Sequence, residues 1–402
     1  EHVQLDHITH IHRLDRELQM WMDPFTIRNL ELIYPNAPQA TTLLQVMDHT
    51  KTPMGGRMLK RWLVAPLTDL KAIEKRLSVV TDFYQHSNRK QRMQELLQSV
   101  GDLERLMAKV ATGRIGPRAI NQLKNTLLLI PKVTEITSQS DQEALRSLGE
   151  GLDSCSACCQ WITDRLSEDA PTQLGKGDTI ASGYSAELDD YRSIARDGKK
   201  ILDEMLERET EKTGISSLKI SFNNVFGYYI EVRNTHKDKV PETWIRKQTL
   251  VNAERYITEE LKAYETKIIG AEDQIAQLEQ RLFQELVKGL IPYIENIQNN
   301  ARILAELDCL CGFASLAKAR NYNCPTLNEG DSLTIVQGRH PVIEYQMPPE
   351  ESYIPNDLEL NKNNQQIIMI TGPNMSGKSA VLRQTALIVL MAQVGSYIPA
   401  DR

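Results

Sequence analysis

The chain has 402 residues, of which 41% are hydrophobic and 25% charged, a composition that suggests two to four globular domains and excludes a collagen, a disordered tail or a disulfide scaffold. Its 47 basic and 53 acidic side chains give a net charge of -6, which argues against a surface covered in positive charge but leaves room for a local basic patch. No run of about 18 apolar residues occurs, so the sequence predicts no membrane span.

The first residue is Glu1 rather than methionine, and no signal-peptide pattern follows, so we expect a piece of a longer protein. Beyond residue 43, apolar side chains recur at a spacing of three and four, and Pro and Gly separate the runs. This spacing predicts a helical domain whose apolar stripes form its core. The expected helices cover 43–47, 57–64, 70–85, a segment from about 102, and 123–130, with a pause at Thr52–Gly56 and a break at Gly113–Pro117.

Three of the six cysteines lie close together, at Cys155, Cys158 and Cys159. Their spacing is close to that of zinc ligands, but no second pair and no nearby histidine accompanies them. A chain of this length needs no disulfides to hold its core, so ordinary thiols in a reducing cytosol are the favoured interpretation.

A charged helix is expected from Glu187 to about Lys212. The period then changes, because apolar and polar residues alternate over 218–222 and again over 228–233. With Asn223–Asn224 as the turn between them, these two runs predict a β-hairpin.

One long helical pattern follows from about 253 to 298, with a heptad-like apolar seam from Ile268 to Leu282. Pro292 is expected to kink or end this helix. The pattern fits a mechanical arm and an ordinary bundle helix equally well. Further on, Leu333–Val336 is a candidate strand.

The residues 366–370 form a short apolar run, partly β-branched, which predicts a buried parallel strand. Directly after it, Gly372–Ser379 matches the phosphate-binding pattern G-x-x-x-x-G-K-[ST] in full. Its backbone N–H groups would surround phosphate oxygens, Lys378 would meet the β- and γ-phosphates, and the Ser379 hydroxyl would bind Mg²⁺. A helix from Lys378 to about Val394 would aim its positive end at the same phosphates. A dinucleotide-binding loop is excluded because no G-x-G-x-x-G occurs.

A P-loop ATPase also needs a later strand with an acidic residue for Mg²⁺. After Lys378 the sequence contains one acidic residue, Asp401. We therefore expect the nucleotide-binding sheet to be truncated, with no hydrolysis by this piece alone and weak nucleotide affinity.

Several segments together resemble the MutS family of DNA mismatch repair proteins, in the order in which that family carries them. Beside the loop these are LRQTA (382–386) and GSYIPA (395–400). Further matches are MDPFTIRNLEL (22–32), TPMGGR (52–57), LVAPL (63–67), FGYYI (226–230), QTLVNAERY (248–256) and GRHPVIE (338–344). The resemblance covers nearly the whole chain.

The resemblance implies a mainly α fold: a helical core with long lever helices, a small inserted β-containing clamp, and a truncated α/β P-loop ATPase domain at the C-terminus. The corresponding residues would be 1–19 for the end of the connector, 20–199 and 261–318 for the core and lever, 200–260 for the DNA clamp, and 325–402 for the ATPase domain. The family's Phe-x-Glu mismatch wedge is missing, so this piece is not expected to read mismatches.

The resemblance also implies ATP and Mg²⁺ as cofactors, with Ser379 as the metal ligand and Tyr353 packed on the adenine. Two positions depart from the family, because Ser376 stands where Gly is usual and Ala380 where Thr is usual. The expected nucleotide-binding residues are Gly372, Pro373, Asn374, Met375, Ser376, Gly377, Lys378, Ser379 and Tyr353.

The predicted hairpin region, 217–258, carries seven basic against four acidic side chains, interleaved with Tyr and Asn. On charge alone a solvated hairpin is the favoured interpretation, but the resemblance implies contacts to the DNA backbone, which position a duplex without reading its sequence. With so few charges, we expect weak and strongly salt-dependent binding. The expected contacts are Asn223, Asn224, Arg246, Lys247, Thr249 and Asn252.

Three hypotheses remain open. The first is an ATP-gated clamp that binds mismatched double-stranded DNA and signals repair, as a homodimer with a MutL-type partner in the bacterial cytoplasm, at the nucleoid. The second is a MutS paralogue of recombination control, and the third is a helical interaction module whose P-loop is vestigial. The clamp hairpin and the segment at 22–32 favour the first.

Overall fold

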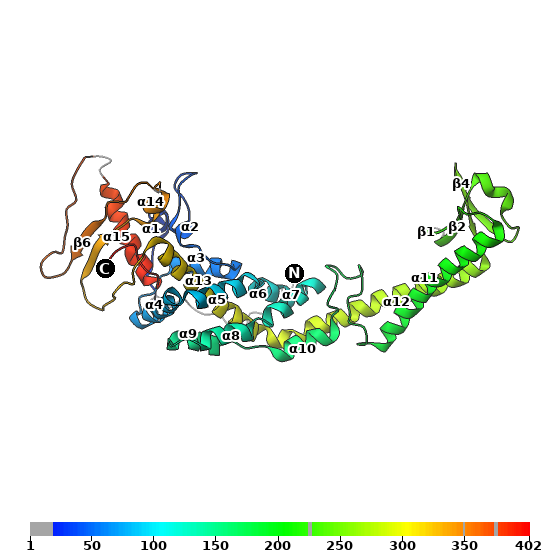
Figure 1. Ribbon diagram of the computed structural model, residues 1–402, viewed down its shortest axis with the longest axis horizontal. Helices are drawn as coiled ribbons and strands as arrows, with labels where there is room; N and C mark the ends of the chain where they lie inside the picture. The colour runs from blue at the N-terminus through cyan, green and yellow to red at the C-terminus, as the bar shows by residue number, and fades with distance from the viewer. Residues whose placement is uncertain (1–18, 224–226, 349, 374–376) are drawn as a thin grey trace. The chain divides into compact units, whose positions relative to one another are not determined.

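The computed structural model describes residues 19–223, 227–348, 350–373 and 377–402 (Figure 1). The chain folds into two compact units. The first comprises the described residues up to Arg114, together with Gln122–Cys159 and Leu290–Arg402, and the second comprises Ile115–Asn121 and Gln160–Gly289. Long helices dominate and the sheets are small, so the predicted mainly α fold is confirmed.

The helices up to residue 165 are α1 (Pro24–Asn29), α2 (Leu43–Met47), α3 (Pro53–Val64), α4 (Leu70–Gln85), α5 (Ser87–Gln98), α6 (Leu103–Ala111), α7 (Pro117–Leu127), α8 (Ile130–Ser138), α9 (Glu143–Glu150) and α10 (Ser156–Arg165). The later helices are α11 (Ala186–Thr213), α12 (Glu259–Gly289), α13 (Ile294–Arg320), α14 (Pro341–Gln346) and α15 (Lys378–Gln393), with 3₁₀ turns at Asn234–Lys239 and Ile291–Tyr293. The strands are β1 (Lys219–Asn223), β2 (Gly227–Arg233), β3 (Ile245–Thr249), β4 (Ala253–Ile257), β5 (Leu333–Gly338) and β6 (Asn356–Leu360).

The first unit is built around α13, which is buried along most of its length and packs against α3, α4, α5 and α6. Its Asp308, 1% exposed, accepts hydrogen bonds from the backbone N–H groups of Lys51 and Thr52, both at 2.8 Å, and from the Thr52 hydroxyl at 2.7 Å. Thr52 in turn caps the N-terminus of α3. The carboxylate therefore fixes where α3 begins.

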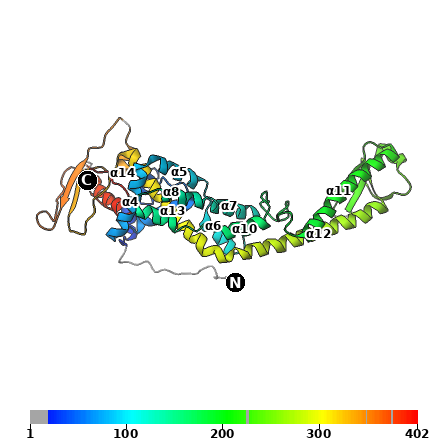
Figure 2. The ribbon, with the colours of Figure 1, turned by 60° about the horizontal axis from the view of Figure 1, so that its bottom comes forward.

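The second unit contains α11 and α12, which lie side by side in both views (Figure 1, Figure 2). The predicted charged helix is confirmed as α11. Of the predicted seam on α12, Ile268, Ala271 and Leu278 are buried. A buried ion pair between Arg192 of α11 and Glu279 of α12, 2.6 Å apart, joins the two helices.

Two bounds predicted for the long helix differ from the structure. The helix starts at Glu259, because Ala253–Ile257 forms the strand β4, so the predicted helical start at 253 is wrong. It ends at Gly289, and a 3₁₀ turn that contains Pro292 separates it from α13, which confirms that proline ends it.

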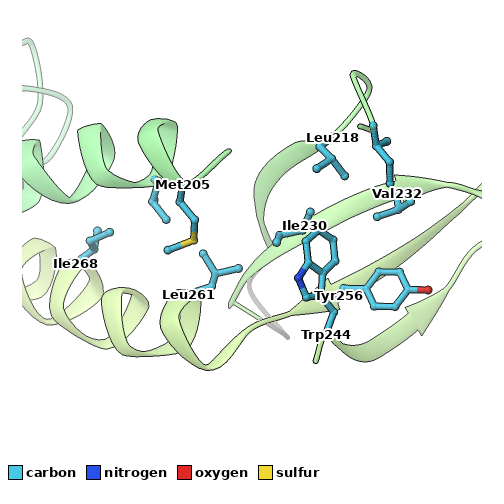
Figure 3. Packing of buried hydrophobic residues seen from close by; sticks show 10 residues of the cluster. Met205, Leu218, Ile230, Val232, Trp244, Tyr256, Leu261 and Ile268 are labelled. Carbon is cyan, nitrogen blue, oxygen red and sulfur yellow. The ribbon is translucent and has the colours of Figure 1, made fainter. Parts of the chain in front are cut away.

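The predicted hairpin is confirmed as β1 and β2, which belong to a four-stranded antiparallel sheet of order β1-β2-β4-β3. One face of this sheet packs on α11 and α12, and Figure 3 shows Ile230 and Trp244 on the side of Met205 and Leu261, with Tyr256 beyond Trp244. The buried cluster consists of Leu202, Met205, Ile215, Leu218, Ile230, Val232, Trp244, Tyr256, Leu261 and Ile268.

A second sheet contains β5 and β6, which pair antiparallel. The candidate strand at 333–336 is confirmed within β5. The buried parallel strand predicted at 366–370 is wrong, because these residues form no strand, and Ile367 and Met369 are 82% and 85% exposed. A buried strand needs neighbours that accept its backbone hydrogen bonds, and no described residue pairs with this segment as a strand.

Candidate nucleotide and nucleic-acid sites

The glycine-rich loop leads directly into α15, whose first residue is Lys378 (Figure 1). Gly372 and Gly377 have φ of 150° and 85°, in the left-handed region that favours glycine. The Lys378 ammonium turns into the loop and donates hydrogen bonds to the carbonyl oxygens of Gly372 and Pro373. The predicted site residues Asn374, Met375 and Ser376 lie outside the described residues.

The N-terminus of α15 fits a phosphate group. Within the described residues no side chain caps it, so N–H groups of its first turn are available to an anion. Ser379, the predicted Mg²⁺ ligand, is exposed in the same turn. Further along, Leu387, Ile388 and Met391 are buried and hold the helix in the first unit.

Tyr353, the predicted adenine-packing residue, lies against α15. Its hydroxyl donates a hydrogen bond of 2.9 Å to the side-chain oxygen of Gln384. Burial raises the pKa of Tyr353, with a smaller contribution from the negative charge of Glu344. The structure therefore brings Tyr353 to the same helix that carries Lys378.

The predicted DNA contacts lie on the four-stranded sheet of the second unit, but at two ends of it. Arg246, Lys247 and Thr249 lie on the edge strand β3, and Asn252 is in the turn between β3 and β4. Asn223 ends β1 beside the turn to β2, and the pairing of Arg233 with Ala253 places that turn at the opposite end from Asn252. Asn224 lies outside the described residues.

The charge of Arg246 is partly used within the protein. Its guanidinium is 3.3 Å from the carboxylate of Glu254, which is 5% exposed and also accepts a hydrogen bond from the Tyr256 hydroxyl. Burial and the Glu254 carboxylate raise the pKa of Tyr256 to about 12. Both Arg246 and Lys247 are exposed, but among the described residues Lys247 has no salt bridge.

Sequence reasoning missed a second polar group, on the sheet face that points away from the helices. The Arg255 guanidinium lies 4.3 Å from the ring centre of Tyr229 and donates a hydrogen bond of 2.9 Å to Gln248. Arg255 is also 3.5 Å from Glu231. The alternation Tyr229, Glu231, Arg233 in β2 was a signal for a polar face, but only the register with β4 brings Arg255 onto it.

Neither a metal cluster nor a membrane helix is found in the part of the chain that the structure describes. No three His, Cys, Asp or Glu side chains there are grouped so that they could hold a metal ion. Cys155, Cys158 and Cys159 are buried and form no disulfide, and burial raises the pKa of each thiol. Among the described residues, no helix is both long enough and apolar enough to cross a bilayer.

Comparison with known proteins gives one family. A family model described as MutS domain III matches residues 25–314, and another described as MutS domain V matches residues 368–402. The DNA mismatch repair protein MutS of Christiangramia forsetii is 57% identical over 399 residues, 99% of this chain and 46% of that protein. The proteins of the same name from Flavobacterium psychrophilum and Parabacteroides distasonis are 55% and 51% identical over 401 residues, 100% of this chain and 46% of each relative. The chain thus spans about half the length of these relatives, and it belongs to the MutS family.

Proposed function

We propose that this chain supplies the nucleotide loop and the DNA clamp of a mismatch repair ATPase. The relatives are named for mismatch repair, which favours this function over the recombination-control alternative. We assign 20–199 and 261–318 to the core and lever, 200–260 to the clamp and 325–402 to the ATPase domain. The partners we propose are mismatched double-stranded DNA, a second copy of the chain and a MutL-type repair protein.

The observation that carries the nucleotide part is the loop at the start of α15. Lys378 already turns its ammonium into the loop, and the helix N-terminus has no side-chain cap within the described residues. ATP would place its β- and γ-phosphates against these groups, Mg²⁺ would bind the Ser379 hydroxyl, and the Tyr353 ring would stack on the adenine.

Binding of ATP tests this assignment. Lys378→Ala in the full-length protein that contains this sequence should weaken ATP binding at least about tenfold, because a charge-assisted contact to phosphate is lost. Isothermal titration calorimetry with Mg²⁺ measures the Kd. Lys362→Ala, which removes another exposed lysine of the same unit, is the matched control. Unchanged affinity in Lys378→Ala would reject the nucleotide site.

The DNA part is supported by the exposed polar edge of the sheet, where Lys247, Thr249 and Asn252 are accessible to a phosphate backbone. Such contacts position a duplex and give salt-dependent affinity. Arg246 would contribute less than Lys247, because Glu254 already neutralises part of its charge.

Fluorescence anisotropy with a labelled duplex tests the DNA part. Lys247→Ala should make the negative slope of log K against log salt shallower by about 0.9, the value expected for one lost phosphate contact. Lys262→Ala, an exposed lysine on α12, should leave the slope unchanged. Tighter binding of mismatched than of matched duplex by the full-length protein separates mismatch repair from recombination control, and equal binding would contradict our choice.

A further inference from the structure

Gln384 is a buried polar side chain in the middle of α15. It is 2% exposed, among the apolar residues that hold the helix in the first unit. Its side-chain oxygen accepts a hydrogen bond from the Tyr353 hydroxyl at 2.9 Å and one from the Asn356 amide at 3.5 Å. A buried amide is retained at such a position only when its hydrogen bonds are satisfied.

The Gln384 side chain fits beside β5 because the residue at the end of that strand, Gly338, has no side chain. A Cβ added at Gly338 would lie 2.7 Å from the side-chain nitrogen of Gln384 and 2.6 Å from a methyl group of Ile335. Gly338 pairs with Asn356, so β5 and the start of β6 approach α15 at this point. The position of the Gln384 amide is therefore fixed from several sides.

The same helix carries the phosphate-binding lysine. Gln384 follows Lys378 by six residues, which puts it about 9 Å further along the helix axis. One rigid element thus bears the lysine that meets the phosphates and the amide that holds the Tyr353 ring.

We propose that Gln384 is a positioning residue that fixes the Tyr353 ring as a preformed stacking surface for the nucleobase. This inference rests on the proposed function, because it needs a nucleotide in the loop. An aromatic ring that is held before binding loses less conformational freedom when the base arrives, so the affinity for the whole nucleotide is higher. Gln384 itself does not touch the nucleotide.

The opposing interpretation is that the Tyr353–Gln384 hydrogen bond only fastens the segment before β6 to α15. The two interpretations differ in which ligands they affect. A stacking surface matters for a ligand with a base and not for inorganic tripolyphosphate, which occupies the phosphate loop alone. A fastening role would affect both ligands or neither.

The experiment is a double-mutant cycle in the full-length protein, with Kd values for ATP and for tripolyphosphate measured by calorimetry. Tyr353→Phe removes only the hydroxyl, and Gln384→Met removes the acceptor with little change of volume. Each should weaken ATP binding about two- to tenfold, the fold-change that corresponds to ordering one side chain on binding. The double variant should be no weaker than the single ones, because both remove the same contact. Tripolyphosphate affinity should stay at the wild-type value.

One further variant is the control. Tyr345→Phe, which removes the hydroxyl of an exposed tyrosine on α14, should bind both ligands as the wild type does. Because Tyr353→Phe deletes no buried volume, its result stands even if Gln384→Met fails to fold.

Equal losses for ATP and tripolyphosphate, additive losses in the double variant, or no loss of ATP affinity in Tyr353→Phe would each overturn the inference. These outcomes are distinct from failure of the proposed function, in which Lys378→Ala leaves the affinity for both ligands unchanged.

Discussion

Asp308 and Gly55 form a close contact between helices that are far apart in the sequence. A Cβ added at Gly55 would lie 2.3 Å from a carboxylate oxygen of Asp308, whereas one added at the neighbouring Gly56 would lie no nearer than 3.5 Å to any other group. Burial raises the pKa of Asp308, and the hydrogen bonds from Lys51 and Thr52 partly oppose that rise. Gly55 is therefore the residue that lets a buried carboxylate reach the start of α3.

Two alanine substitutions at adjacent positions of α3 test this contact. Gly55→Ala should lower the free energy of unfolding by about 1–3 kcal/mol, because the added methyl group displaces Asp308. Gly56→Ala should be neutral or should raise it by up to about 1 kcal/mol, because alanine favours the helix. Urea unfolding followed by circular dichroism compares the two. Equal effects would show that the Asp308 contact does not decide the outcome.

The sequence predicts a pause over Thr52–Gly56 and a helix from residue 57, and this prediction is wrong. Thr52 caps α3, and Gly55 and Gly56 lie inside it. A local pattern contains no information about Asp308, more than 250 residues away, and that contact is the reason for a glycine at position 55. The phosphate loop was recognisable because all its residues are contiguous.

His340 gives the fold a pH dependence. Its ring caps α14, where Nδ1 accepts a hydrogen bond of 3.3 Å from the Ile343 N–H. Burial lowers its pKa from 6.5 to about 4, the positive charge of Arg383 contributes, and Glu31 opposes the shift. Between these two pKa values the unfolded chain binds more protons than the folded chain, so stability should fall as the pH falls from 6.5 to 4.

His340→Asn should remove this part of the pH dependence. Asparagine keeps an acceptor for the helix cap but does not titrate. The wild type should lose about 3 kcal/mol more unfolding free energy than the variant between pH 6.5 and pH 4, from a shift of about 2.5 pKa units at 1.36 kcal/mol each. Chemical unfolding at several pH values gives both curves. If the unfolding free energies of the wild type and the variant change with pH in parallel, protonation of His340 does not cause the pH dependence.

At the scale of elements, α11 and α12 are joined by ion pairs of different burial, among them Arg192–Glu279, Arg208–Glu260 and Arg281–Glu187. Arg192 and Glu279 are nearly inaccessible to solvent, and Glu279 also accepts a hydrogen bond of 3.0 Å from the Thr179 N–H. Arg281 and Glu187, 4.0 Å apart, are exposed on the same two helices. Removing one partner of a buried pair leaves an uncompensated charge in a low dielectric, whereas water compensates at the surface.

Glu279→Gln should lower the unfolding free energy of the second unit by about 3 kcal/mol, at the lower end of the range for buried pairs because Asp178 and Asp189 stay near Arg192. Arg281→Ala should change it by less than about 1 kcal/mol. Hydrogen exchange of the α11 and α12 amides reports this unit separately. Similar protection in both variants would contradict a role for the buried pair.

Helices were predicted more accurately than strands, for a physical reason. A helix satisfies its hydrogen bonds locally, so α11 followed from periodicity, and Pro292 indicated the break in the helical pattern predicted to run to 298. β4 was assigned to a helix because its five residues precede a long helical pattern, and only pairing with β2 and β3 makes it a strand. The resemblance implied both Asn223 and Asn252 as DNA contacts, and only the register shows that they lie at opposite ends of the sheet.

At the scale of the whole molecule, the proposed nucleotide loop lies in the first unit and the proposed DNA clamp in the second. If ATP and DNA binding are coupled, the coupling is reciprocal, so each ligand changes the affinity for the other by the same factor. The proposal of an ATP-gated clamp requires this factor to differ from one.

Saturating non-hydrolysable ATP analogue should therefore change the Kd of the full-length protein for duplex DNA by about 5- to 150-fold, the usual range for coupled sites. Lys378→Ala should abolish the change, because the analogue no longer binds. Lys247→Ala should weaken DNA binding and keep the factor. Anisotropy titrations of labelled duplex with and without the analogue measure this factor. Identical titration curves for the wild type would exclude gating.

The apolar run at 366–370 should make this chain prone to aggregate in concentrated solution. Ile367 and Met369 turn large side chains to water, and the described part of the chain provides no strand beside them. Such segments pair readily with copies of themselves, which is the first step towards cross-β assemblies. A charged gatekeeper in this run, such as Met369→Lys, should therefore raise the concentration at which the protein precipitates.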